Sequence, residues 1–203
     1  MTFSQIDVFF RWLHVIAGIT WIGHLYFFNF VNVPLQGKLD DTTKKAVNPQ
    51  LMPRALWWFR WGAMITFLAG LTLFVLTYFY TPGVGLGPTS LLLDANGITA
   101  RAMWIFFGML LGTIMWFNVW FLIWPMQKAL LTGKVPGDQA ASVRKRALLV
   151  SRTNSFLSGP MLFGMLAPSH YGAISVPALV MTIVLGGAAV WVSIRSSSTV
   201  GQL

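Results

Sequence analysis

Residues 8–33 read V-F-F-R-W-L-H-V-I-A-G-I-T-W-I-G-H-L-Y-F-F-N-F-V-N-V, and this apolar run of 26 residues decides the fold class. A helix needs about 20 mainly apolar residues to cross the hydrocarbon core of a bilayer, so the run is long enough. It is too long for a secretory signal peptide, and it has neither a basic leader nor a small-residue cleavage site. The stretch therefore predicts a transmembrane helix.

Further apolar stretches along the chain meet the same length requirement. They cover about residues 56–80, 102–124, 147–167 and 174–194. We expect an all-α integral membrane protein, in which five transmembrane helices form one helix bundle. The whole chain, 1–203, is expected to be a single transmembrane domain without a soluble domain or an internal repeat.

The composition supports this prediction and excludes several kinds of site. Apolar residues make up 56% of the chain and charged residues only 9%, against about 25% charged in a soluble domain. All five acidic residues are Asp, which excludes a Glu-x-x-His di-iron centre and an HExxH zinc site. The absence of Cys excludes disulfides, iron–sulfur clusters and covalently attached haem.

The basic residues predict the orientation of the helices. The chain carries a net charge of +9, and most of its Lys and Arg lie in the segments 34–55 and 126–146. Such segments beside apolar spans are typical of cytoplasmic loops rather than of nucleic acid binding. The N-terminus is then outside and the C-terminus, after Arg195, is cytoplasmic.

Histidines inside a membrane span are the first candidates for chemistry. His14 lies about two turns into the first span, and His170 follows the outer end of the fourth. The predicted topology brings both to the outer side, where they could be the axial metal ligands of one non-covalent haem b. A membrane histidine can equally be a hydrogen-bonded partner in helix packing.

Small and aromatic residues accompany His14. Gly18, one turn further along, leaves room beside a porphyrin plane, and Trp21 follows at the next turn. Gly62, Thr66 and Gly70 form a similar small-residue stripe on the second span. Taken alone, such stripes favour ordinary helix–helix packing in lipid.

Four other residues complete the candidate cofactor site. Arg11 and Arg101 lie at the outer ends of their spans, where a guanidinium could pair with a haem propionate or face lipid headgroups. Asn154 and Met165 share roughly one face of the fourth span, which leads toward His170. Asn154 could bind a ligand or a partner helix.

His24 cannot share an iron with His14. It lies ten residues further along the helix, which corresponds to about 15 Å along the axis and about 80° around it. Its role stays open, with a methionine or water as the opposite ligand if His24 binds iron instead of His14.

Several stretches resemble the urate oxidase N-terminal domain family, the membrane domain of bacterial membrane-bound urate oxidases. They are R-W-L-H-V-I-A-G-I-T-W-I-G (11–23), A-L-W-W-F-R-W-G-A (55–63), N-V-W-F-L-I-W-P-M-Q (118–127) and R-T-N-S-F-L-S-G-P-M-L-F-G-M-L-A-P-S-H-Y (152–171). The resemblance supports the same candidate residues, among them His14, Asn154 and His170, but not His24. It also implies the bacterial inner membrane as the location.

The full-length relatives carry more spans and a C-terminal cytochrome c domain. We therefore expect electrons to leave this chain through a separate partner, such as a cytochrome c or a larger membrane complex. The first functional hypothesis is a haem b-binding electron-transfer subunit, with membrane lipids around it and no nucleic acid partner. The alternatives are a stand-alone oxidase or hydroxylase of urate or a similar molecule, and a cofactor-free structural or assembly subunit.

Overall fold

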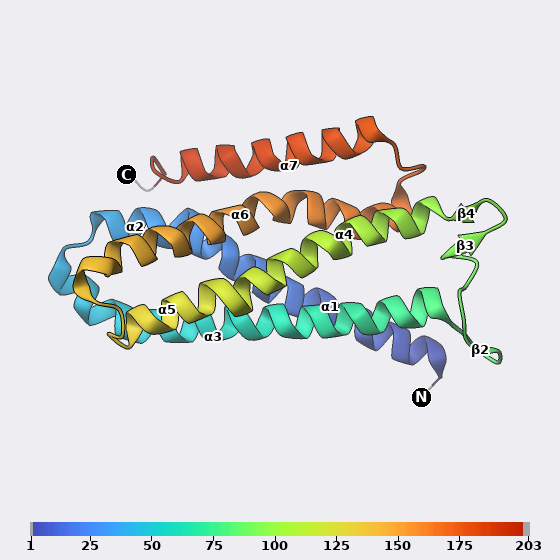
Figure 1. The fold of residues 1–203 in the computed structure, drawn as a ribbon, viewed down its shortest axis with the longest axis horizontal. Helices are drawn as coiled ribbons and strands as arrows, with labels where there is room; N and C mark the ends of the chain where they lie inside the picture. Colours follow the sequence, from blue (N-terminus) through green and yellow to red (C-terminus); the bar gives the residue numbers. More distant parts are fainter. Residues whose placement is uncertain (1, 201–203) are drawn as a thin grey trace.

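Long helices dominate the structure, a computed structural model that describes residues 2–200 (Figure 1). The long helices are α1 (Phe3–Tyr26), α3 (Asp41–Phe74), α4 (Ala100–Phe117), α6 (Gly137–His170) and α7 (Val176–Ser196). Shorter helices are α2 (Val33–Lys38) and α5 (Trp124–Leu131). Three π-helical segments are η1 (Phe27–Asn32), η2 (Val75–Phe79) and η3 (Asn118–Ile123).

The connection between α3 and α4 contains the strands, which form two small antiparallel pairs. They are β1 (Tyr80–Thr81) with β2 (Gly85–Leu86), and β3 (Leu93–Asp94) with β4 (Gly97–Ile98). Tyr80 lies opposite Leu86 in the first pair, and Leu93 lies opposite Ile98 in the second. The prediction of an all-helical architecture is thus confirmed, with strands confined to this connection.

Continuous helical segments carry most of the predicted spans. In the described part of the chain, four segments are long and apolar enough to cross a membrane, namely Phe3–Lys38, Asp41–Phe79, Ala100–Leu131 and Val176–Ser196. The expected stretch 147–167 lies inside α6, which is equally long but also contains Arg152 and Asn154. The chain is therefore a helical protein of the multi-pass membrane type.

The two basic segments are more helical than expected. α3 already begins at Asp41 and α6 at Gly137, and each helix has 34 residues. A helix of this length extends about 51 Å, well beyond the hydrocarbon core of about 30 Å. The basic ends of α3 and α6 therefore project past the apolar part of the molecule.

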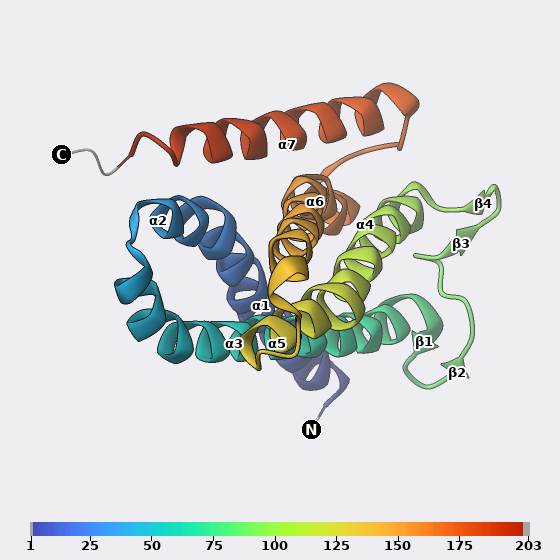
Figure 2. The same ribbon diagram turned by 60° about the vertical axis from the view of Figure 1, so that its left-hand side comes forward.

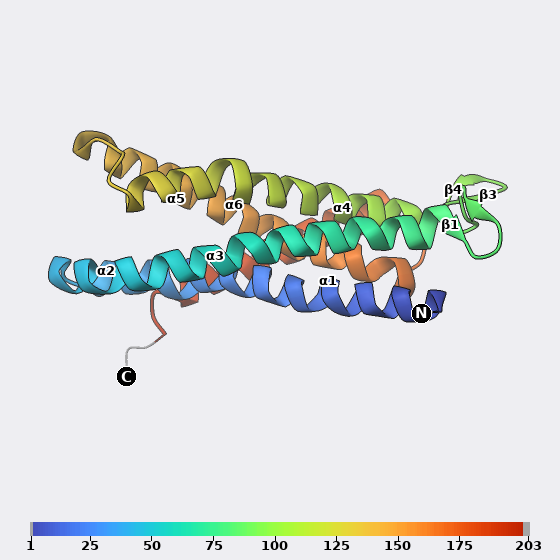
Figure 3. The same cartoon turned by 90° about the horizontal axis from the view of Figure 1, so that it is seen from below.

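The connections alternate between two ends of the helix assembly. The N-terminus, the β-strand connection and the turn from α6 to α7 lie at one end (Figures 1 and 3). The α2–α3 and α5–α6 connections and the C-terminal end of α7 lie at the other. Both segments expected to be basic loops thus share one end.

The first six helices and their π-helical segments form two equivalent hairpins, although no repeat was expected from the sequence. The order α1–η1–α2–α3 recurs as α4–η3–α5–α6, and η1 and η3 have six residues each. Pro34 and Pro125 occupy the second position of α2 and α5. The pattern R-A-L-x-x-x-R occurs at 54–60 in α3 and again at 146–152 in α6.

Burial follows the same repeat. Ala55, Ala63 and Thr66 of α3 are buried, and so are Ala147, Ser155 and Ser158, each 92 positions later in α6. The helix pairs also correspond, because α1 packs along α3 and α4 packs along α6. The chain is therefore a pair of like-oriented hairpins, with α7 added.

Two of the π-helical segments, η1 and η3, lie just before the repeated prolines. A proline inside a helix lacks an N–H, and its ring clashes with the carbonyl four residues earlier. That carbonyl belongs to Phe30 for Pro34 and to Phe121 for Pro125, inside η1 and η3 respectively. The wider π turn accommodates each proline without ending the helix, so both segments continue into short α-helices.

Glycines allow close contact within each hairpin. A Cβ at Gly62 of α3 would lie 3.1 Å from the backbone nitrogen of Trp21 in α1. In the second hairpin, a Cβ at Gly164 of α6 would lie 2.8 Å from the Cα of Gly108 in α4. Both hairpins thus pack backbone against backbone, as small-residue interfaces do in lipid.

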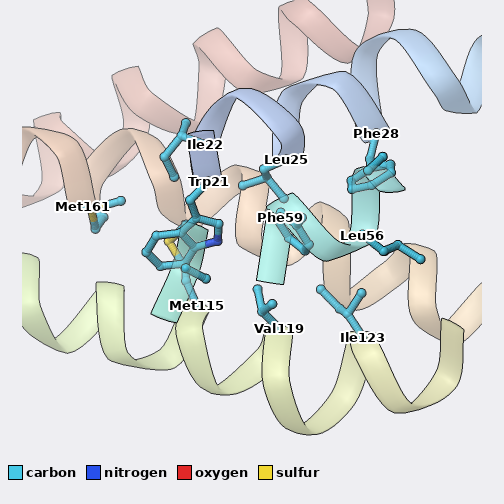
Figure 4. Close-up of a cluster of buried hydrophobic side chains, with 12 residues drawn as sticks. Trp21, Ile22, Leu25, Phe28, Leu56, Phe59, Met115, Val119, Ile123 and Met161 are labelled. Carbon is cyan, nitrogen blue, oxygen red and sulfur yellow. The ribbon is translucent and has the colours of Figure 1, made fainter. Parts of the chain in front are cut away.

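The main apolar core lies between the two hairpins (Figure 4). In the first hairpin, Trp21 and Leu25 of α1 and Phe28 of η1 pack with Leu56 and Phe59 of α3. The second hairpin supplies the remaining large side chains, Met115, Val119, Ile123 and Met161. α7 packs mainly along α6 and stands apart from α3 (Figure 2). It approaches α6 closely at Gly186, whose added Cβ would lie 2.7 Å from the Cδ of Pro160.

Candidate functional site

His14 is fixed between the two helices of the first hairpin. Its Nδ1 lies 2.9 Å from the backbone carbonyl oxygen of Thr66 in α3. A carbonyl can only accept, so Nδ1 carries the proton in a neutral imidazole and Nε2 keeps its lone pair. This is the tautomer in which a histidine binds a metal through Nε2, with a backbone carbonyl fixing the ring.

Gly70 makes room for the His14 ring. A Cβ at Gly70 would lie 2.8 Å from Cε1 and 3.0 Å from Nδ1 of His14. No side chain can therefore replace the glycine hydrogen without moving the ring. The sequence analysis named Thr66 and Gly70 only as parts of a packing stripe. The signal that could have identified their role is the four-residue spacing of this stripe opposite His14.

Gly18 and Trp21 also face α3. A Cβ at Gly18 would lie 3.9 Å from Cγ2 of Thr66, an ordinary contact distance. Trp21 is 2% exposed and belongs to the main core. Its indole N–H is buried without a hydrogen-bond partner in the described chain. Both residues thus continue the α1–α3 interface that begins at His14.

The two predicted arginines lie near the same end of the molecule but in different surroundings. Arg11 binds Asp7 through two hydrogen bonds of 2.6 and 3.1 Å and lies 3.4 Å from the hydroxyl of Thr77. Arg101 lies in the first turn of α4, and its Nε is buried without a described partner. Arg11 is thus already paired, whereas part of the Arg101 guanidinium is not.

His170 is the last residue of α6 and is exposed. The turn that follows it is anchored to α4. The indole of Trp104 donates to the backbone carbonyl of Gly172 at 3.2 Å, and its ring centroid lies 5.6 Å from that of Tyr171. The end of α6 is therefore held against α4, although the His170 side chain itself is open to the surroundings.

Two polar contacts, one from α1 and one from η1, join the first hairpin to the antiparallel α6. The hydroxyls of Tyr26 and Ser158 lie 2.8 Å apart, and Asn29 donates to the hydroxyl of Ser151 at 2.9 Å. His14 precedes Tyr26 by 12 residues, and His170 follows Ser158 by 12 residues. At 1.5 Å per residue, both lie about 18 Å from the Tyr26–Ser158 contact in the same direction. Counted from the Asn29–Ser151 contact, His14 lies 15 residues away and His170 lies 19 residues away, so the two contacts show only that both histidines lie toward the same end of the molecule.

Asn154 and Met165 make their contacts with the second hairpin. Asn154 is fully buried, accepts from Asn118 at 2.8 Å and donates to the carbonyl of Met115 at 3.0 Å. The Cε of Met165 would lie 3.7 Å from a Cβ at Gly112. These two residues therefore hold α6 to α4 and η3, and their contacts do not include His14. Within residues 2–200, no cluster of three or more His, Cys, Asp or Glu could hold a metal ion.

The fold and this arrangement define a class of protein, a helical membrane protein of the multi-pass type, built from two packed hairpins with His14 at a helix interface. The chain belongs to the family described as urate oxidase N-terminal, which matches residues 1–48, 37–93 and 90–197. The resemblance expected from the sequence is thereby confirmed. The comparisons with curated proteins and with solved structures found no match.

Proposed function

We propose that this chain binds one haem b between α1 and α6 and serves as an electron-transfer subunit of a membrane redox complex. His14 and His170 are the proposed axial ligands. The observation that carries the proposal is the hydrogen bond from His14 Nδ1 to the carbonyl of Thr66, since it leaves Nε2 unprotonated inside an apolar bundle. A bound haem would supply a one-electron couple at this position.

The fit of the remaining residues supports the proposal. His14 and His170 lie toward the same end of antiparallel helices, and the exposure of His170 leaves its imidazole available. Arg101 has a buried Nε without a described partner and is the better candidate for a propionate, because Arg11 is already paired with Asp7. Asn154 and Met165 act on the position of α6 through their contacts with α4 and η3.

The proposal includes five spans in the bacterial inner membrane, with the N-terminus outside. It is supported by the alternation of the connections between two ends and by the basic segments that share one end (Figure 1). α6 is counted as a span because it is as long as α3 and packs along α4, even though it is less apolar. Electrons would then pass to a separate protein, such as a cytochrome c, on the outer side.

A reduced-minus-oxidised absorption spectrum of the purified protein tests the proposal. We expect b-type bands that disappear in His14→Ala and in His170→Ala. The bands should persist in His24→Ala, the matched control, because His24 lies on another face of α1 than His14. Circular dichroism shows whether each variant keeps its helices. A folded protein without haem, or bands that survive both substitutions, would contradict the proposal and favour a cofactor-free structural subunit.

The family description favours a second candidate, an oxidase or hydroxylase of urate or a similar small molecule. The two candidates differ in one measurement. Reduction of added cytochrome c that depends on urate would support the enzyme, whereas haem bands without any response to urate would support the electron-transfer subunit alone.

A further inference from the structure

A pocket of about 410 Å³ opens between α1 and α3, toward the end that carries the basic segments. Its lining includes Gly23, His24 and Phe27 on one side and Arg54 and Trp58 on the other. The volume falls within the range of pockets that bind small organic ligands. This pocket is separate from the candidate haem site, since His14 lies ten residues before His24 on α1.

His24 offers a hydrogen-bond acceptor to this pocket. Its Nδ1 lies 2.7 Å from the backbone carbonyl oxygen of Thr20, one turn earlier in α1. Because the carbonyl can only accept, Nδ1 is the protonated nitrogen of a neutral His24. Nε2 then has a free lone pair, which a hydroxyl group of a ligand could satisfy.

Arg54 offers donors to the same pocket. Its Nη1 donates to the backbone carbonyl and to the side-chain oxygen of Gln50, at 2.5 and 3.0 Å. These bonds fix the guanidinium and leave other N–H groups for a ligand, because the group has five donors in all. The pocket thus combines one acceptor and one group of donors.

Aromatic side chains supply the apolar walls. Trp58 and Phe27 line the pocket from opposite helices, and Trp58 packs edge-on against Trp57 with ring centroids 4.9 Å apart. Such walls favour a flat ring over a branched polar headgroup. The aromatic and basic residues at this end are also typical of a membrane–water interface, so a ligand can enter from the bilayer.

The second hairpin provides an internal comparison. At the positions equivalent to Gly23, His24 and Trp58 it has Ile114, Met115 and Val150, while Arg146 matches Arg54. A Cβ at Gly23 meets nothing within 4 Å, so this position is open where the second hairpin has the side chain of Ile114. Met115, the equivalent of His24, is fully buried. The space, the acceptor and the large aromatic wall are therefore special to the first hairpin and are not required by the shared hairpin fold.

We propose that this pocket binds the ring of a lipid-soluble quinol, with a ring hydroxyl donating to Nε2 of His24 and Arg54 donating to a ring oxygen. A quinol hydroxyl both donates and accepts, which matches this pair of side chains. The oxygens of a phosphate diester only accept, so the phosphate group of a lipid would leave the His24 lone pair unused. The binding site does not depend on the proposed haem.

Binding of a short-chain benzoquinol to the full-length protein in lipid nanodiscs tests this proposal, measured anaerobically by isothermal titration calorimetry. Gly23→Ile introduces the residue of the second hairpin into open space, and we expect it to weaken binding at least tenfold. His24→Met, also taken from the second hairpin, should weaken binding severalfold. Gly37→Ile is the matched control, because a Cβ at Gly37 likewise meets nothing within 4 Å but lies outside the pocket.

Wild-type affinity in Gly23→Ile would overturn the proposal, as would the absence of binding to the unmodified protein. If phosphatidylglycerol in the nanodiscs competes with the benzoquinol, and His24→Met does not change the benzoquinol affinity, the pocket binds an anionic headgroup. That result would also overturn the proposal. Failure here is distinct from failure of the haem proposal, because Gly23→Ile should leave any b-type absorption bands unchanged.

Discussion

His14 of α1 donates from Nδ1 to the backbone carbonyl of Thr66 in α3, 52 residues further along the chain, over 2.9 Å. The ring can reach the carbonyl of Thr66 because Gly70, one turn later in α3, has no side chain there. The ring of His14 occupies the space that a side chain at Gly70 would need. The orientation of the candidate ligand therefore depends on a glycine of another helix.

Gly70→Ala should displace the His14 ring. The new Cβ would lie 2.8 Å from Cε1, so either the ring or the α1–α3 contact must move. Overpacking of this kind lowers the free energy of unfolding by about 1–3 kcal/mol. Thermal or denaturant unfolding in detergent measures the loss. Gly18→Ala is the control, since its Cβ would make only an ordinary contact at 3.9 Å. Equal stability of the two variants would contradict this interpretation.

Gly164→Ala should separate α6 from α4. Its Cβ would lie 2.8 Å from both Cα and N of Gly108, which are backbone atoms that no rotamer change can move away. We expect a loss of about 1–3 kcal/mol in the free energy of unfolding. In Gly112→Ala the new Cβ would face the flexible end of Met165 at 3.7 Å, so that variant should be nearly neutral. If Gly112→Ala lost more free energy of unfolding than Gly164→Ala, the closest contact between α4 and α6 would lie elsewhere than at Gly108 and Gly164.

Arg60 should couple the two hairpins through its guanidinium. The central carbon of this group lies 4.0 Å from the ring centroid of Trp124 and 5.0 Å from that of Trp120. A double-mutant cycle with Arg60→Leu and Trp124→Leu should give a coupling energy of about 0.5–2 kcal/mol. Arg60→Lys should lose part of it, because an ammonium lacks the flat stacking face.

The pair Arg195 and Trp191 of α7 is the control for this cycle. Its separation is 5.4 Å, and Trp191 is 54% exposed, so its coupling should be smaller. A coupling for Arg60 and Trp124 no larger than that of the α7 pair would refute a joining role for Arg60.

Asp40 caps α3 outside the spans. Its carboxylate accepts from the hydroxyl of Thr43 at 2.7 Å and from the Thr43 backbone N–H at 2.9 Å. These bonds favour the charged form and lower the pKa of Asp40 below its usual value, the hydroxyl bond having the larger effect. The stabilisation by Asp40 is therefore complete above the unfolded-state pKa of about 3.9 and is lost as pH falls through the lower folded-state pKa.

Carboxyl carbon NMR titration measures the pKa of Asp40. In Thr43→Ala the midpoint should rise toward the ordinary aspartate value, since the hydroxyl donor is gone. Thr42→Ala should leave the midpoint nearly unchanged, because Thr42 contributes only through its backbone. If both variants titrate like the unmodified protein, the Thr43 hydroxyl does not set the pKa of Asp40.

The sequence alone determined that the chain is helical and of the membrane type, because the free energy of burying about 20 apolar residues in lipid is a local property of the chain. It also determined the family and the candidate histidines. It did not determine the helix ends, since α3 and α6 continue far into the basic segments. Continued backbone hydrogen bonding, together with the Asp40 cap in the case of α3, outweighs the loss of apolar character there.

Only the tertiary structure decided which helix each polar group meets. The partner of His14, the contact between Tyr26 and Ser158 and the pairing of Asn154 with Asn118 depend on the rotation and depth of two helices relative to each other. The repeat of the two hairpins became clear from the equivalent π-helical segments and burial, which gave meaning to the short pattern that the two halves share. Lipid tolerates many different apolar side chains on an exposed helix face. The two hairpins can therefore differ in sequence while both keep close backbone contacts between their helices.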